Sequence, residues 1–182
     1  APSIEGYLFP ATYSFDPGVT ADQVISAMVD RMEQELAGYE ISLKDSLEIV
    51  TLASIIQSEG RLTEDFFKIS TVFANRLQRG MPLQSDPTVK YRYEGNLDSF
   101  QEGLKDETSP FNTYLRPGLP VGPISNPGPL AMESSLRPAV GDWLYFVSIN
   151  LNTGETIFSE TLAEHEKAAD IYRQWCRDNP ND

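Results

Sequence analysis

The chain has 182 residues, 40% of them apolar, which is enough for one domain with a hydrophobic core. Its formal charge of −13 argues against binding to nucleic acid or to anionic lipid, since both require a basic surface. Cys176 is the only cysteine and His165 the only histidine, which excludes an internal disulfide and argues against histidine-based triads and histidine-rich zinc sites.

An extended segment and a first helix are predicted at the start of the chain. Residues 4–15, IEGYLFPATYSF, are rich in β-prone residues but contain Pro10, which is typical of a short strand or an ordered extended segment. Thr20 and Gln23 form a capping-box pattern, so we expect a helix from there to about Gly38.

Two further helices are predicted before residue 80. Ser42 is the expected cap of the first, which contains the stretch ASIIQSEG and ends before Gly60. In the second, apolar residues recur at helical spacing from Phe66 to Leu77, and the helix is expected to end near Gly80.

Residues 80–130 differ in composition from the rest of the chain. Eight of the 13 prolines and six of the 12 glycines lie there. We expect mostly loop, with a strand near 88–93 and a short helix near 98–104. Long loops in a compact domain are often functional, although a proline-stiffened surface excursion is the alternative.

The last third of the chain predicts a helix, a hairpin and a second helix. The first helix is expected around 129–136, and the strands at 142–149 and 156–160. Thr161 and Glu164 form a capping box for a final helix that runs to about Arg177. His165 lies on the apolar stripe of that helix, so we interpret it as a packed residue.

Glu59 is the most informative residue of the sequence. It lies three residues after Ile56 and seven after Leu52, which places its carboxylate on the core-facing stripe of the helix that ends at Gly60. Apolar neighbours and a helix C-terminus both disfavour the anion, so the pKa should be raised, as a proton donor requires. The alternative is an ordinary helix-end glutamate that faces solvent or pairs with Arg61.

Several blocks, taken in order, carry a resemblance to a known family. They are EGYLFPATY, ASIIQSEG, FANRLQRGMPLQSDPTVKY, SPFNTYLRPGLPVGPISNPG, LRPA with DWLYFVS, and ETLAEHEKA. Together these blocks resemble the endolytic murein transglycosylases, the MltG or YceG-like family, over about residues 4–170.

The resemblance implies an enzyme that cuts peptidoglycan between N-acetylmuramic acid and N-acetylglucosamine and leaves 1,6-anhydromuramyl ends. The family's catalytic acid maps onto Glu59, while Gln57 stands where many relatives have another glutamate. Glycoside hydrolases generally need two carboxylates. In a lytic transglycosylase the 6-hydroxyl of the sugar is the nucleophile, so one glutamate can act as acid and then as base. No metal or organic cofactor is expected.

The other blocks supply candidate substrate contacts, because amides, hydroxyls and aromatic rings suit sugar recognition. These candidates are Glu5, Gln84, Asp86, Asn112, Thr113, Tyr114 and Asn126. Asp86 is the best candidate for a second carboxylate that stabilises an oxocarbenium-like charge. Asp86 and Asn126 each precede a proline, so a structural role in a turn remains open for both.

Three other functions are weighed against the transglycosylase. A glycan-binding module would not cleave its ligand, and a muramidase using Glu59 with Asp86 would leave reducing ends. A pyridoxal-phosphate lyase needs a Schiff-base lysine and a phosphate-binding loop, and the sequence has no glycine-rich phosphate loop.

We expect an α+β fold, with helices packed on a small, mostly antiparallel sheet and the 80–130 loops walling a cleft over the end of the Glu59 helix. Residues 1–182 are expected to form a single catalytic domain. The resemblance implies a longer protein with an N-terminal membrane anchor and a LysM-like subdomain, on the extracytoplasmic face of the bacterial cytoplasmic membrane. Its partners would be peptidoglycan strands and possible cell-wall synthesis proteins.

Overall fold

The computed structural model describes residues 3–93 and 97–180. These ranges contain seven α-helices, a short 3-10 helix and one two-stranded antiparallel sheet, which confirms the α+β class. In chain order the elements are α1 (Ala21–Gly38), η1 (Leu43–Asp45), α2 (Leu47–Glu59), α3 (Thr63–Gln78), α4 (Asp86–Lys90), α5 (Leu97–Lys105), α6 (Pro129–Leu136), β1 (Tyr145–Ser148), β2 (Thr156–Ser159) and α7 (Leu162–Asp178). None of these helices is long and apolar enough to cross a membrane.

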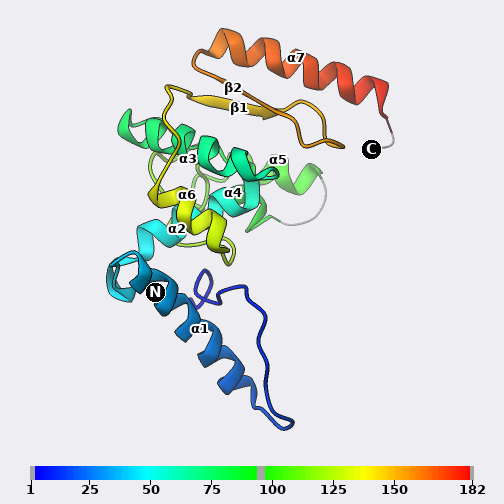
Figure 1. Cartoon of the computed structure of the whole chain (residues 1–182). Helices are drawn as coiled ribbons and strands as arrows, with labels where there is room; N and C mark the ends of the chain where they lie inside the picture. Colours follow the sequence, from blue (N-terminus) through cyan, green and yellow to red (C-terminus); the bar gives the residue numbers. More distant parts are fainter. Residues whose placement is uncertain (1–2, 94–96, 181–182) are drawn as a thin grey trace.

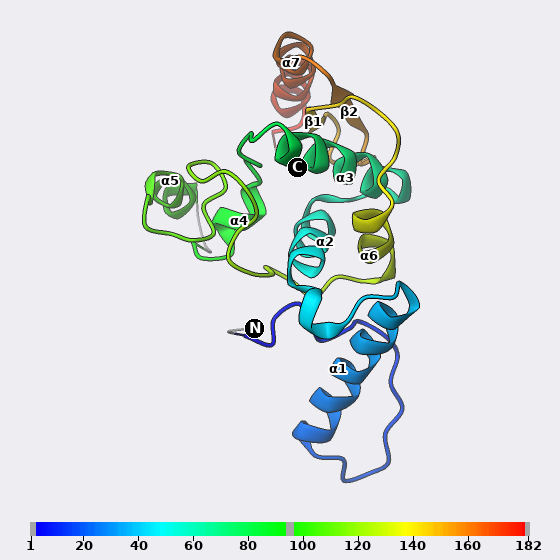
Figure 2. The ribbon, with the colours of Figure 1, turned by 90° about the vertical axis from the view of Figure 1, so that its left-hand side faces the viewer.

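The elements are stacked, with α2 near the middle (Figure 1). At one end α7 lies along the β1–β2 hairpin, the hairpin contacts α3, and α3 packs on α2 and α6. At the other end α1 and the segment before it project as an arm. Figure 2 shows α4 and α5 on the opposite side of α2 from α6. Helix α2 therefore has neighbours on both sides, and its C-terminus lies close to α3 and α4.

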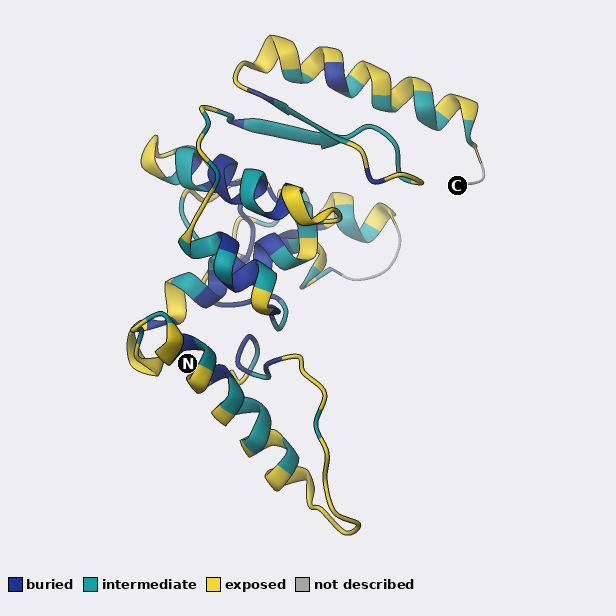
Figure 3. Ribbon diagram, in the orientation of Figure 1, coloured by how far each residue is buried: buried dark blue, intermediate teal, exposed yellow. Residues whose placement is uncertain are grey.

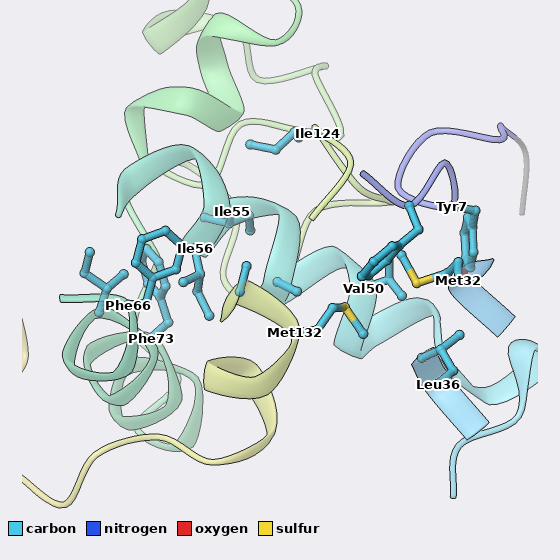
Figure 4. Packing of buried hydrophobic residues seen from close by; sticks show 14 of the residues in the cluster. Tyr7, Met32, Leu36, Val50, Ile55, Ile56, Phe66, Phe73, Ile124 and Met132 are labelled. Atoms are coloured by element: carbon cyan, nitrogen blue, oxygen red, sulfur yellow. The ribbon is translucent and has the colours of Figure 1, made fainter. Parts of the chain in front are cut away.

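The core is concentrated on α2 and α3 (Figure 3). Ile55 and Ile56 of α2, Phe73 of α3 and Met132 of α6 belong to one buried cluster (Figure 4), and each of these side chains is at most 1% exposed. Burying a side chain of this size stabilises a fold by about 1.5–3 kcal/mol. This packing holds α2 firmly in place, and with it the position of Glu59 at its end.

The arm follows the sequence prediction in outline. Thr20 N donates to Gln23 Oε1 at 2.9 Å and Gln23 N donates to Thr20 Oγ1 at 3.3 Å, which completes the predicted capping box. Residues 4–15 contain no strand: they begin with a turn, closed by a bond from Tyr7 N to Ile4 O at 3.1 Å, and continue without regular structure. One backbone bond, from Phe9 N to Met28 O at 3.3 Å, ties the segment to α1.

Two local predictions are wrong. Ser42 does not cap α2; its Oγ accepts from Asp45 N at 3.3 Å and caps η1, and α2 begins only at Leu47. The strand expected at 88–93 is instead the helix α4 followed by a turn. Asp86 and Pro87 open α4 as residues that favour the first turn of a helix, and this start signal outweighs the β-prone residues that follow it.

The other elements of the second half agree with the sequence. The short helix expected near 98–104 is α5, and the one expected at 129–136 is α6. The hairpin pairs Tyr145 with Ser159 and Ser148 with Thr156, although β1 is shorter than the predicted 142–149. Helix α7 has the predicted capping box at Thr161. The hairpin packs on α3 through β1, and α7 packs on the outer side of the hairpin (Figure 1).

Candidate active site

Glu59 is the last residue of α2, and its side chain is half-buried. The chain turns immediately afterwards at Gly60, which is extended (φ −70°, ψ 136°). A Cβ atom on Gly60 would lie 2.5 Å from the ring of Phe66, so only glycine lets α3 approach the end of α2 this closely. The helix end therefore fixes where the carboxyl group is presented.

The carboxyl group of Glu59 accepts a hydrogen bond from Ser85 Oγ at 2.7 Å. Arg61, which the sequence offered as an ion-pair partner, instead donates from Nη1 to Leu151 O at 3.0 Å. Burial raises the pKa of Glu59 from 4.5 to about 7, opposed by the bond from Ser85; the charge of Asp86 raises it further and that of Lys90 lowers it. Near neutral pH the protonated and ionised forms of Glu59 are therefore both populated.

Ser85 is held by the loop that contains Thr113. Ser85 N donates to Thr113 Oγ1 at 3.1 Å, and Ser85 O accepts from Thr88 Oγ1 at 2.6 Å. Gln84 N donates to Thr113 O at 3.0 Å, and the hydroxyls of Thr88 and Thr113 are 2.8 Å apart. Ser85, Thr88 and Thr113 are at most 2% exposed. Thr113 therefore supports the serine that contacts Glu59.

A cleft of about 380 Å³ lies over Glu59. Its other lining residues are Arg76, Leu83, Gln84, Asp86, Tyr114, Tyr145, Phe146, Leu162 and His165. Within it, Tyr114 Oη donates a hydrogen bond to Asp86 Oδ1. Burial and this bond raise the pKa of Tyr114. The cleft thus combines a partly protonated carboxyl group, a second carboxylate and several aromatic rings.

Gln84 has an unusual backbone conformation at the edge of the cleft. Its φ is 51°, in the left-handed region that residues other than glycine rarely adopt. Its side-chain Oε1 accepts from Arg76 Nη1 at 3.2 Å. The strained backbone turns the chain so that Ser85 faces Glu59, and the bond to Arg76 keeps Gln84 beside the cleft.

Asn112, one of the candidate substrate contacts, is not among the residues that line the cleft with Glu59 and Gln84. It is 1% exposed, and its Nδ2 donates to Gly103 O, Leu104 O and Asp106 O at 3.0–3.2 Å. Its Oδ1 accepts from the backbone N–H groups of the next loop, including Tyr114 N at 3.0 Å. All of these contacts are to backbone, so Asn112 shapes the loop that carries Thr113 and Tyr114.

Asn126 and Glu5 lie together, also outside the residues that line the cleft. Asn126 Oδ1 accepts from Gly6 N at 2.9 Å and from Leu8 N at 3.0 Å, and its Nδ2 donates to Glu5 Oε1 at 3.4 Å. These contacts attach the N-terminal segment to the loop before α6. Of the seven candidate contacts, the cleft brings Gln84, Asp86 and Tyr114 together with Glu59.

Comparison with known proteins bears on this arrangement. Residues 1–171 match the model of the YceG-like family. The chain belongs to the YceG-like family.

Two YceG-like relatives carry the name endolytic murein transglycosylase. The Bacillus subtilis protein is 40% identical over 174 residues, which cover 93% of this chain and 48% of that protein. The Streptococcus pneumoniae D39 protein is 37% identical over 174 residues, which cover 90% of this chain and 31% of that protein. A crystal structure of a yceG-like protein from Listeria monocytogenes has a TM-score of 0.74 and 40% identity, over 90% of this chain and 55% of that one. The chain thus spans about half or less of these curated relatives.

Sequence reasoning missed several residues around the cleft of this YceG-like chain. Ser85 lies between two residues that were named, but a serine in a turn gives no signal of its own. His165 stacks on Tyr145, with ring centroids 5.3 Å apart, as a packed residue would, yet it also lines the cleft. Its Nδ1 is buried and has no hydrogen-bond partner in the described ranges. In those ranges no group of three or more His, Cys, Asp or Glu residues could hold a metal ion.

Proposed function

We propose that the chain is the catalytic region of an endolytic lytic transglycosylase. It would cleave the bond between N-acetylmuramic acid and N-acetylglucosamine within peptidoglycan strands and leave 1,6-anhydromuramyl ends. The observation that carries this proposal is Glu59, a carboxyl group with a pKa of about 7, hydrogen-bonded to Ser85 in a cleft lined by aromatic and polar residues. The names of the relatives support the choice of substrate.

In the first step Glu59 acts as a general acid. Its proton passes to the glycosidic oxygen, the bond from that oxygen to C1 of the muramic acid breaks, and positive charge develops at C1 and the ring oxygen. Ser85 occupies Oε1 as a donor, so the transferable proton is held on Oε2. Asp86 lines the same cleft and can stabilise the developing charge electrostatically.

In the second step Glu59 acts as a base. The muramic acid 6-hydroxyl adds to C1, its proton passes to the Glu59 carboxylate, and the acid is regenerated without a water molecule entering the product. The hydrogen bond from Ser85 stabilises the anion between the two steps. One carboxyl group with a pKa near the working pH suits both roles.

End-group analysis tests the reaction. Purified glycan strands are digested with the protein, and the masses of the new ends are measured. Ends that lack one water relative to a reducing sugar support the transglycosylase. Reducing ends would instead favour a hydrolase that uses Glu59 with Asp86, and intact strands would favour a glycan-binding module.

The setting of the intact protein is part of the same proposal. A longer polypeptide would carry an anchor and place this region on the extracytoplasmic face of the cytoplasmic membrane, where peptidoglycan is found. Cell-wall synthesis proteins would be its neighbours there. Fractionation of cells that express the full-length protein, with protease added outside the cytoplasmic membrane, tests this: protection from the protease would contradict it.

A further inference from the structure

Arg76 is a buried cation that has no carboxylate partner among residues 3–93 and 97–180. It lies in the last turn of α3 and is 7% exposed. The ion pairs found in the described ranges join other residues: Arg31 with Glu35, Arg137 with Glu133, and Arg173 with Asp170. A buried charge is costly unless its hydrogen-bonding groups are satisfied, so the surroundings of this guanidinium are informative.

Two of the three guanidinium nitrogens of Arg76 are fully used. Nε donates to Leu144 O at 2.7 Å. Nη1 donates to Pro82 O at 3.2 Å, Leu83 O at 2.8 Å and Gln84 Oε1 at 3.2 Å. These bonds clamp the side chain between α3, the segment before α4 and the segment before β1. The guanidinium is therefore preorganised, and a ligand would lose little entropy in ordering it.

The third nitrogen, Nη2, has no hydrogen-bond partner in residues 3–93 and 97–180. The unpartnered side-chain atoms that are fully buried in those ranges belong to other residues. Nη2 is therefore accessible to solvent. Arg76 lines the cleft over Glu59, and its guanidinium lies 5.1 Å above the centre of the Tyr145 ring. A fixed donor with positive charge thus faces the same cavity as the candidate acid.

Gln84 relates this donor to the acid. Its side chain accepts from Arg76, and the next residue, Ser85, donates to Glu59. The cation and the acid therefore line one cleft and are connected through the adjacent residues Gln84 and Ser85. Its ligand should be an acceptor on a sugar close to the bond that is cleaved.

We propose that Arg76 binds the acyl oxygen of the lactyl group on a muramic acid residue. This inference rests on the proposed function and adds a specificity determinant to it. Hydroxyl, ether and acetamido groups occur on both sugars of the strand, whereas the lactyl group occurs only on muramic acid. The carboxyl group of the lactyl substituent is a free carboxylate in bare strands and part of an amide in peptide-bearing strands. Both forms present an oxygen that can only accept a hydrogen bond. The cleft would thereby distinguish muramic acid from glucosamine.

Binding to the Glu59→Gln variant tests this without turnover. Calorimetry would compare three ligands: chitotetraose, a tetrasaccharide of alternating glucosamine and muramic acid with free lactyl carboxylates, and the same tetrasaccharide with stem peptides. We expect the carboxylate ligand to bind about 10-fold or more tightly than chitotetraose, as for a charge-assisted hydrogen bond. The peptide-bearing ligand should keep part of this preference, because an amide oxygen is a weaker acceptor.

Arg76→Lys in the same background should remove most of the preference for muramic acid and leave chitotetraose binding within about twofold, because lysine has a charge but no guanidinium fork. Arg79→Lys is the matched control: Arg79 is exposed, lies just beyond α3 and does not line the cleft, so the preference should persist. Circular dichroism checks that both variants fold.

The comparison of ligands uses the native Arg76, so it remains valid even if Arg76→Lys fails to fold. Equal binding of the carboxylate ligand and chitotetraose, or no measurable binding of the carboxylate ligand, would overturn the assignment. An equal loss of affinity for all three ligands in Arg76→Lys would also overturn the assignment. Wild-type cleavage is scored separately: anhydro ends without a muramic acid preference would contradict this inference alone, and a preference without cleavage would contradict the proposed reaction alone.

Discussion

Two stretches of the proline- and glycine-rich region use similar side chains for different purposes. The first consists of two segments, residues 83–90 and 112–114, which lie together at the end of α2. There Ser85 contacts Glu59 directly. Residues 123–128 run along the C-terminal half of α2, with bonds to Ser54 and Gln57, and there Asn126 binds the backbone of the N-terminal segment. Both stretches contain polar residues that suit a sugar, but only the first contributes side chains to the cleft.

The difference follows from what loop backbone requires. A loop without regular structure leaves N–H and C=O groups unpaired, and buried ones must find partners. Asn112 supplies such partners through five hydrogen bonds to backbone, and Asn126 through two. An asparagine in a buried loop is thus more often committed to the fold than available to a ligand. The following predictions test this division between cleft residues and loop-supporting residues.

The largest effect is expected from Glu59→Gln. The change keeps the volume of the side chain but removes the proton, so strand cleavage should fall by about 10²–10⁴-fold. Cleavage rates on purified strands measure this. Glu48→Gln, at the exposed first turn of the same helix, is the control and should retain its rate. A Gln variant that cleaves nearly as fast as the wild type would remove Glu59 from the mechanism.

Asn112→Ala should mainly affect stability. It leaves three carbonyl and two N–H groups without their partner, so we expect a loss of about 2–4 kcal/mol in the free energy of unfolding, measured by urea denaturation. Cleavage per folded molecule should also fall, because the loop holds Thr113 and Tyr114. Unchanged stability would show that these bonds are replaced by water.

Stability should depend on pH through Glu59. Its folded pKa of about 7 lies above the unfolded value of 4.5, so the folded state binds the proton more tightly. The stabilisation from this group is complete below about pH 4.5 and is lost as the pH rises through 7. The stability of Glu59→Gln relative to the wild type should therefore rise by about 2–3 kcal/mol between pH 4.5 and pH 8. A constant difference across this range would contradict the raised pKa.

Ser85→Ala should have a smaller effect on the reaction. The hydroxyl stabilises the carboxylate form, so its removal should raise the pKa of Glu59 and slow cleavage by about 10-fold, the cost of one hydrogen bond to a charged group. In a profile of kcat/KM against pH, the decline on the alkaline side should shift to higher pH. Thr88 contacts Ser85 O but not Glu59, so Thr88→Val should leave that limb in place.

The sequence predicted the position of Glu59 well because the signal for it is local. Helical spacing alone placed Glu59 on the buried face of α2, and Gly60 marked the end of the helix. The same local rules correctly placed both capping boxes. They gave the wrong structure at α4, where β-prone residues follow a strong helix start.

The remaining site residues depend on contacts between distant parts of the chain. Ser85 lies 26 residues from Glu59, and Arg76 bonds to a carbonyl 68 residues away. No pattern within either segment records such a contact, since it arises when α3, α4 and the hairpin pack together. The packed position of His165 was predictable from its stripe on α7, but its place in the cleft depends on how the hairpin positions α7 relative to α3.

The smallest effect is expected at Asn126, and it tests the comparison most directly. Asn126 is half-buried, and its Oδ1 accepts from two N–H groups of the N-terminal segment. Since solvent can replace part of these bonds, Asn126→Ala should cost about 1 kcal/mol of unfolding free energy, less than Asn112→Ala. Cleavage per folded molecule should stay within about twofold of the wild type, because Asn126 does not line the cleft. If KM rises severalfold while stability is unchanged, Asn126 contacts substrate after all. The glycan strand would then extend from the cleft along α2 to the N-terminal segment, and Glu5 would be the next residue to test.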